Sequence, residues 1–114
     1  MAAFDVSVNG KIYKMFYNRD SIRQFEEIGG SITDMKEKLF STTDRLFYVG
    51  LRKFHRNISF MEAQQISDKA IEEYGIDNVY SALVDKFMEV FTLGADNATT
   101  MKSFIVSKAP KASA

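Results

Sequence analysis

The dipeptide Asn9-Gly10 is the local feature that most constrains the fold of this chain. It separates AFDVSV at residues 3–8, which alternates apolar and polar residues, from KIYKMFY at residues 11–17, which is rich in aromatic and β-favouring residues. Asn-Gly is the strongest short signal for a two-residue type I′ turn, because both residues of that turn have positive φ. The sequence therefore predicts a β-hairpin over residues 3–17.

The turn type also predicts the register of this hairpin, since a two-residue loop pairs the strands outward from the turn. The expected pairs are Val8 with Lys11, Val6 with Tyr13, Asp5 with Lys14 and Phe4 with Met15. One face is then apolar, whereas the other carries Ile12 and Phe16 next to charged residues. An isolated two-stranded hairpin is only marginally stable in water, so we expect this one to pack on helices or to join other strands.

Helical periodicity and helix-capping signals follow the hairpin. Five helices are predicted: one from a cap at Asn18 or Asp20 to Ile28, a short one within 31–40, one over 43–56, one from the capping box Ser59–Glu62 to Gly75, and one from a cap at Asp77 to Gly94. Gly29-Gly30 supplies the stop for the first of them. The fold class is therefore mainly α (α+β), with an N-terminal hairpin packed on four to five short helices.

Apolar stripes on these helices predict the core. The helix over 43–56 would contribute Leu46, Phe47, Gly50, Leu51 and Phe54; the helix from 59 would contribute Ala63, Ile66, Ala70 and Tyr74; and the last helix would contribute Val79, Tyr80, Leu83, Val84, Phe87, Met88 and Phe91. With 114 residues, of which 46% are apolar, the chain suits one packed domain. We assign that domain to residues 1–94 and expect residues 95–114 to be a flexible tail.

The composition argues against several classes of function. Fifteen basic residues balance fifteen acidic ones, so the field that would steer the whole chain to nucleic acid is missing. No apolar run reaches the roughly 18 residues of a membrane span, and the N-terminus lacks the layout of a signal peptide. The chain has no cysteine, which excludes thiolate metal sites and disulfides. We expect a soluble, unexported protein that binds neither nucleic acid nor membrane.

Residues with catalytic potential are sparse. His55 is the single histidine and lies in a basic segment, Arg52–Arg56, where the charged end of a helix explains it as well. The acidic pairs Glu26-Glu27 and Glu72-Glu73 would point about 100° apart on a helix rather than share a proton. We therefore expect no catalytic, cofactor-binding or metal-binding residues, and no enzymatic activity.

Apolar surface is what remains as a functional signal. A chain with one hairpin and five short helices has few elements that could cover both faces of the hairpin and the apolar face of the last helix. Completion of a monomeric core would explain any one apolar residue on the hairpin's second face or on the last helix, but together these residues suggest a surface for a partner. The candidate partner-binding residues are Ile12, Phe16, Phe87, Val90, Phe91 and Leu93.

The order of features resembles the small tail assembly chaperones of long-tailed (siphovirus-type) bacteriophages and prophages. The likeness covers about residues 4–93. It lies in the hairpin VNGKIYKM, the helix IRQFEEIGGSI, the segment GLRKFHRNIS, the capped helix ending in EEYG, and the final apolar helix.

The resemblance implies a non-enzymatic chaperone in the host cell cytoplasm. Such a chaperone binds and solubilises the tape measure protein, helps to recruit tail tube subunits to it, and is absent from the mature virion. Self-association into a homo-oligomer is also compatible with exposed hairpin edges. A structural component of the phage tail or of the head–tail connector is the first alternative. A small DNA-binding regulator ranks lower, because its recognition helix over 59–74 would be acidic.

Overall fold

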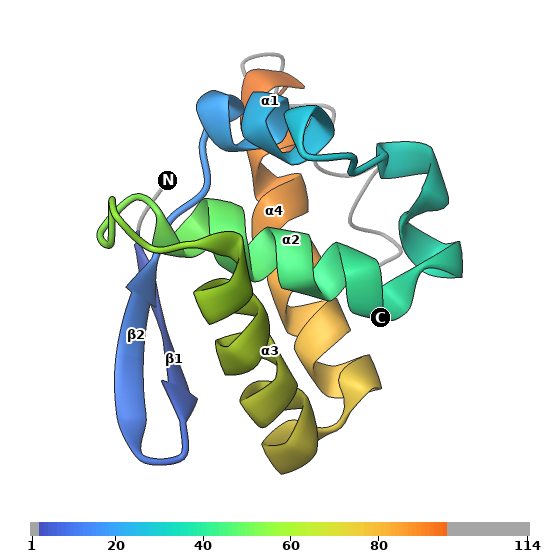
Figure 1. The fold of residues 1–114 in the computed structure, drawn as a ribbon. Coiled ribbons are helices and arrows are strands. Elements are labelled where there is room, and N and C mark those ends of the chain that lie inside the picture. The colour runs from blue at the N-terminus through green and yellow to red at the C-terminus, as the bar shows by residue number, and fades with distance from the viewer. Residues whose placement is uncertain (1–2, 96–114) are drawn as a thin grey trace.

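The computed structural model describes the backbone of residues 3–95 and the side chains of residues 3–90. Its elements are β1 (Phe4–Val8), β2 (Lys11–Met15), α1 (Arg19–Glu27), the 3-10 helix η1 (Ile32–Glu37), α2 (Leu39–Leu51), α3 (Phe60–Tyr74) and α4 (Ile76–Ala95) (Figure 1). The predicted fold class is confirmed: a two-stranded antiparallel hairpin precedes a set of packed helices. The predicted tail beyond residue 95 lies outside the described residues.

The hairpin forms with the predicted turn and register. Asn9 and Gly10 have φ values of 52° and 84°, as a type I′ turn requires. The observed pairs include all four that were predicted, together with Ser7 opposite Ile12. Lys14 Nζ lies 3.9 Å from Asp5 Oδ1 on the outer face, where both side chains are exposed. Met15 and Val8 are buried on the inner face, which packs on the helices as expected.

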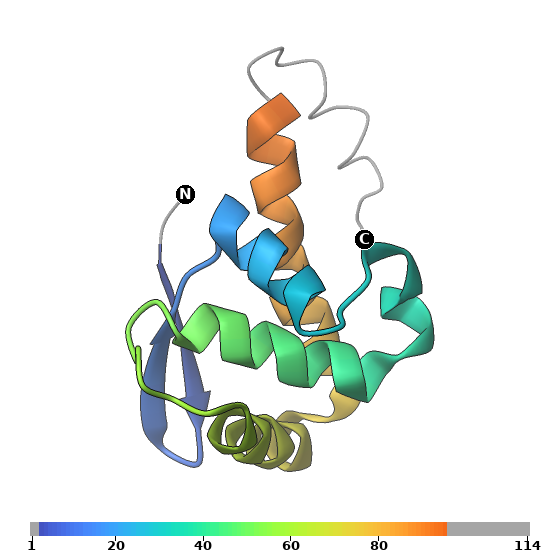
Figure 2. The same ribbon diagram turned by 45° about the horizontal axis from the view of Figure 1, so that its top comes forward.

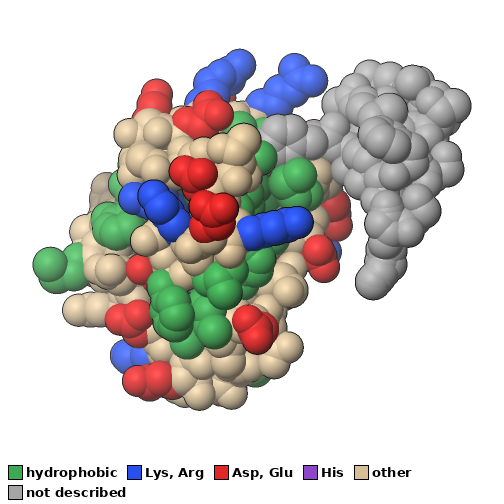
Figure 3. Space-filling view, turned by 90° about the vertical axis from the view of Figure 1, so that its right-hand side faces the viewer, with side chains coloured by type: hydrophobic (Ala, Val, Ile, Leu, Met, Phe, Trp, Pro, Cys, Tyr) green, Lys and Arg blue, Asp and Glu red, His purple; other side chains and the backbone are tan. Residues whose placement is uncertain are grey.

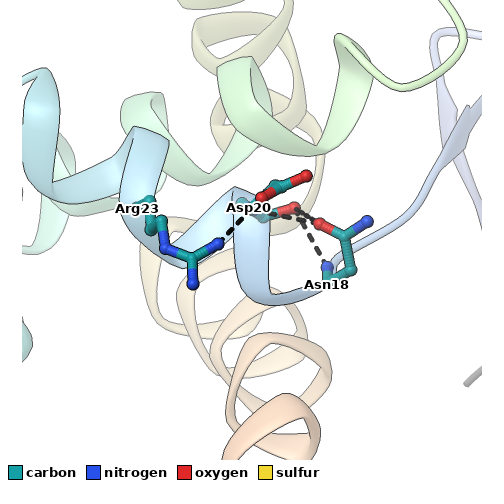
Figure 4. Close-up of polar contacts among 4 residues, drawn as sticks. Asn18, Asp20 and Arg23 are labelled. Carbon is teal, nitrogen blue, oxygen red and sulfur yellow. Dashed lines mark hydrogen bonds and ion pairs between the residues drawn. The ribbon is translucent and has the colours of Figure 1, made fainter.

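Local capping chemistry fixes the ends of α1 and α3. Asn18 Oδ1 accepts a hydrogen bond from Ser21 N at 3.0 Å, and Ser21 Oγ accepts one from Asn18 N at 3.0 Å, which closes a capping box (Figure 4). Ser59 and Glu62 form the predicted box at the start of α3, with distances of 2.9 and 3.0 Å. Gly29 and Gly75 follow α1 and α3 with φ values of 99° and 88°. The predicted ends of these two helices are therefore confirmed.

The middle of the chain differs from the prediction. The short helix within 31–40 is the 3-10 helix η1, and α2 spans Leu39–Leu51 instead of 43–56. Phe54 thus lies beyond the helix and is 46% exposed, so its predicted place in the core is wrong. Arg52 caps α2, and Lys53–Arg56 form the loop that follows. Asp77 lies in the first turn of α4 rather than before it.

Helix α2 occupies the centre of the molecule and contacts α1, α3, α4 and β2 (Figures 1 and 2). Gly50 lets it approach the hairpin closely, because a Cβ at this position would lie 2.6 Å from Met15 Cε. The carbonyl of Gly50 accepts a hydrogen bond from Phe16 N at 3.3 Å. The hairpin is therefore joined to the helices through α2.

An aromatic cluster fills the core between the hairpin, α1 and α4. The ring of Phe87 lies 5.3 Å from that of Tyr17 and 5.1 Å from that of Phe25, centroid to centroid. All three side chains are fully buried. The hydroxyl of Tyr17 donates to the backbone oxygen of Leu46 at 2.8 Å, and burial raises the pKa of this hydroxyl well above its ordinary value. The buried hydroxyl thus has the partner that it needs.

Candidate partner-binding site

An apolar groove of about 460 Å³ lies between β1, α3 and α4. Its apolar lining consists of Phe4, Val6, Phe47, Ala70, Tyr74, Val79, Ala82 and Leu83. Its polar residues are Asp5, Ser7, Asn78 and Lys86. Apolar lining with a few polar groups at the margin is typical of sites that bind apolar ligands or segments.

The walls of the groove follow from the periodicities of the elements that form it. Phe4 and Val6 are two residues apart and share the inner face of β1. Val79 and Leu83 are four residues apart and share one side of α4, where both are nearly fully buried. Ala82 is exposed, and its small side chain leaves space beside Leu83. The groove is thus a hollow with a buried apolar floor.

Hydrogen bonds hold the tip of the hairpin against α3 and fix one end of the groove. The Tyr74 hydroxyl donates to the backbone oxygen of Ser7. Asn9 N donates to Glu73 Oε1 at 2.7 Å, and Asn78 Nδ2 donates to the backbone oxygen of Tyr74 at 2.7 Å. The first two bonds join residues more than sixty positions apart and position β1 relative to α3, whereas the third joins the end of α3 to the start of α4.

The free edge of β1 also borders the groove. Val8 and Lys11 flank a two-residue turn and form a hydrogen-bonded pair, so alternate residues of β1 direct their backbone groups away from β2. Asp5 and Ser7 are these residues, and both line the groove. At the other end, Lys86 Nζ lies 5.7 Å from the centre of the Phe4 ring. An incoming segment would therefore meet apolar side chains, backbone hydrogen-bonding groups and one cation.

Asp44 is a buried carboxylate that joins α2 to α3, away from the groove. It is 8% exposed and accepts hydrogen bonds from Ser67 Oγ at 2.6 Å and from Gln64 Nε2 at 3.2 Å. Burial raises the pKa of Asp44, and the bonds from Ser67 and Gln64 oppose that shift in part. The three side chains satisfy one another, which indicates a structural role between the two helices.

We expect Asp44→Asn to change the dependence of stability on pH. Because the folded-state pKa of Asp44 is raised, the folded protein binds more protons than the unfolded chain between the ordinary value of 3.8 and the raised value. The contribution of Asp44 to stability therefore falls as pH rises through this window. Urea unfolding from pH 3.5 to 7 should show that the variant lacks this fall.

Asp44→Ala is the matched control for this prediction. It removes the carboxylate and leaves the buried Ser67 hydroxyl without its acceptor, so it should lower the free energy of unfolding by about 1–3 kcal/mol and, like Asp44→Asn, lack the fall in stability with rising pH. An Asp44→Asn variant with the same pH dependence as the wild type would contradict the assignment of the raised pKa.

The candidate residues from the sequence are distributed differently from the prediction. Ile12 is 66% exposed and Phe16 is half-buried, so both are accessible on the outer side of the hairpin. Phe87 is fully buried and Val90 is 7% exposed, so both are part of the core, the alternative that the sequence left open, and neither lies on an exposed surface. The side chains of Phe91 and Leu93 lie outside the described residues.

The groove itself was missed by the sequence prediction. Its residues come from β1, α2, α3 and α4, and no local pattern brings such distant segments together. The nearest signal is the presence of the small residues Ala70 and Ala82 on the helices that line the groove, but alanine is also the best helix former. Small residues therefore gave no specific indication of a site.

Two other kinds of site are absent from the part of the chain that the structure describes. The described side chains include no group of three or more His, Asp or Glu residues placed to hold a metal ion. Over the same part of the chain, no helix combines the length and the apolar character that crossing a membrane requires.

The fold and the groove define a small α+β protein with a surface suited to binding an apolar segment. The chain belongs to the family described as Domain of unknown function (DUF5055), whose model matches residues 1–107. No curated protein matches the chain, and no solved structure does so either. The family description carries no function, so the resemblance to tail assembly chaperones stays a prediction.

Proposed function

We propose that this protein is a non-enzymatic phage tail assembly chaperone that binds the tape measure protein. The proposal combines the resemblance in sequence layout with one structural observation, the apolar groove between β1, α3 and α4. In this proposal the groove holds apolar side chains of the tape measure protein before tail tube subunits cover them.

The chemistry of the groove suits this role. A long amphipathic rod presents apolar residues at helical spacing, and each large apolar side chain that leaves water contributes about 1.5–3 kcal/mol. Phe4, Val6 and Leu83 offer a complementary apolar surface. The backbone groups of Asp5 on the free edge of β1 would allow an extended segment to bind as an added strand. Either mode shields apolar surface that would otherwise aggregate.

The proposed site of action is the host cell cytoplasm, where the tail is assembled. The chaperone would keep the tape measure protein soluble, help to recruit tail tube subunits, and then leave. It would be absent from the mature virion. A structural tail or connector component would instead remain in purified particles, so mass spectrometry of virions separates these two functions.

The direct test is co-expression with the tape measure protein encoded nearby. The proposal predicts that much more of the tape measure protein stays in the soluble fraction, and that the two proteins co-purify. If the tape measure protein remains insoluble while this protein is folded and abundant, the proposal is wrong.

A further inference from the structure

A second surface combines exposed apolar residues with unpaired positive charge. Ile12 lies on the outer face of the hairpin and is 66% exposed, and Phe54 in the loop after α2 is 46% exposed. Lys14 Nζ lies 6.0 Å from the centre of the Phe54 ring, so the loop and the hairpin form one surface. Figures 1 and 2 both place this loop beside β2.

Five basic residues belong to the same two segments as these apolar residues, β2 and the loop after α2. We define the basic face as Ile12 and Phe54 together with Lys11, Lys14, Arg52, Lys53 and Arg56. Lys11 and Arg56 line a cleft of about 450 Å³ beside the strand. Within the described part of the chain, Lys11, Lys53 and Arg56 form no ion pair. This surface therefore has cations available to a partner.

Asp5 and Glu62 are acidic groups next to the basic face: Asp5 lies 3.9 Å from Lys14, and Glu62 lines the same cleft as Lys11 and Arg56. Two carboxylates against five basic side chains leave the basic face with an excess of positive charge. By contrast, acidic and basic side chains are interspersed around the hydrophobic patch on the face shown in Figure 3. The positive charge of the basic face is thus a local feature of a chain whose total charge is zero.

We propose that the basic face binds an acidic amphipathic helix of a partner protein. The apolar side of that helix would cover Ile12 and Phe54, and its carboxylates would pair with Lys11, Lys53 and Arg56. A short acidic helix would contact the basic face alone. A long polyanion such as nucleic acid would also meet the rest of the molecule, which carries the balancing negative charge.

The basic face and the groove share no residue. Ile12 and Lys14 point to the outer face of the hairpin, and Lys11 lies beside Tyr13 on β2, whereas the groove is lined by β1. Both surfaces can therefore be occupied at the same time. The inference does not require the groove to bind the tape measure protein.

Fluorescence anisotropy with two synthetic peptides tests this proposal on the full-length protein. Both are amphipathic helices of about 20 residues with identical apolar positions, but one has Glu and the other Lys on its polar side. We expect the acidic peptide to bind roughly tenfold more tightly than the basic peptide at low salt. Its advantage should shrink as salt rises, because screening shortens the range of the charges.

Charge reversal identifies the surface. The double variant Lys11→Glu with Arg56→Glu should lose the preference for the acidic peptide, whereas Lys36→Glu with Lys69→Glu, at exposed positions elsewhere, should keep it. If the first pair disturbs folding, as judged by far-UV circular dichroism, Lys11→Gln with Arg56→Gln replaces it.

Three results would overturn the proposal: equal binding of the two peptides, equal losses in both pairs of variants, or tighter binding of a single-stranded oligothymidine of about 20 nucleotides. The peptides contain no tape measure sequence, so a negative result here leaves the proposed chaperone function to its own test.

Discussion

Phe87→Ala is expected to lower the free energy of unfolding by about 3–5 kcal/mol, as for other buried Phe-to-Ala replacements. Phe87 is fully buried, and its ring lies beside those of Tyr17 and Phe25, so the replacement opens a cavity where the hairpin, α1 and α4 meet. Domains of this size are stable by only about 5–15 kcal/mol, so the variant should lose much of its stability. Urea unfolding monitored by circular dichroism measures the loss.

Two further variants separate loss of packing from a general sensitivity of α4. Phe87→Leu keeps most of the apolar volume and should lose clearly less stability than Phe87→Ala. Asp85→Ala changes an exposed position two residues away and should alter the free energy of unfolding by no more than about 0.5 kcal/mol. A Phe87→Ala variant as stable as the wild type would contradict the placement of Phe87 in the core.

Ala82→Trp is expected to weaken binding of the tape measure protein by roughly 10- to 100-fold. The new side chain would fill the groove beside Leu83 and exclude one or two apolar side chains of the partner, each worth about 1.5–3 kcal/mol. Because Ala82 is exposed, the substitution should leave the fold intact. In the co-expression assay, the tape measure protein should move to the insoluble fraction.

Ser81→Trp is the matched control for this prediction. Ser81 is also exposed on α4, but it is not part of the groove lining, because neighbouring helix positions point about 100° apart. It should retain binding. Equal binding by wild type and Ala82→Trp would show that the partner does not use the groove.

The parts of the fold that local chemistry determines were predictable from the sequence. Asn9-Gly10 determined both the turn and the register, because a two-residue turn leaves no freedom in the pairing of the strands. The Ser59–Glu62 capping box and Gly75 gave the bounds of α3, because each supplies a specific partner or conformation at a helix end. Strong local signals therefore sufficed for these elements.

The errors fall where such signals are weak. Helix α2 begins after Lys38, whose side chain makes no capping hydrogen bond, and it ends at Leu51 with neither Gly nor Pro to mark the end. The apolar stripe was therefore extended to Phe54, which is exposed in the structure. Local chemistry alone did not determine where this helix stops.

The candidate site required tertiary structure. Helix periodicity indicates that Phe87 and Val90 lie on an apolar face of α4, but it does not show which residues the hairpin and α1 cover. The groove depends on how β1 lies against α3 and α4. The Tyr74 hydroxyl, which donates to Ser7 O, and the Glu73 carboxylate, which accepts from Asn9 N, fix β1 against α3 across more than sixty residues of sequence. Ile12 was identified correctly as exposed because strand alternation placed it opposite the inner face.

The central claim is that the groove holds the tape measure protein, and site-specific photo-cross-linking tests it most directly. The chain has no cysteine, so Ala82→Cys introduces a single thiol in the groove that can carry a benzophenone group. Ser81→Cys provides the same probe one residue away, outside the groove lining. We predict that illumination of the purified complex links the tape measure protein strongly through the Ala82→Cys probe and weakly through the Ser81→Cys probe. A stable complex that cross-links equally from both positions, or only from the Ser81→Cys probe, would contradict the account.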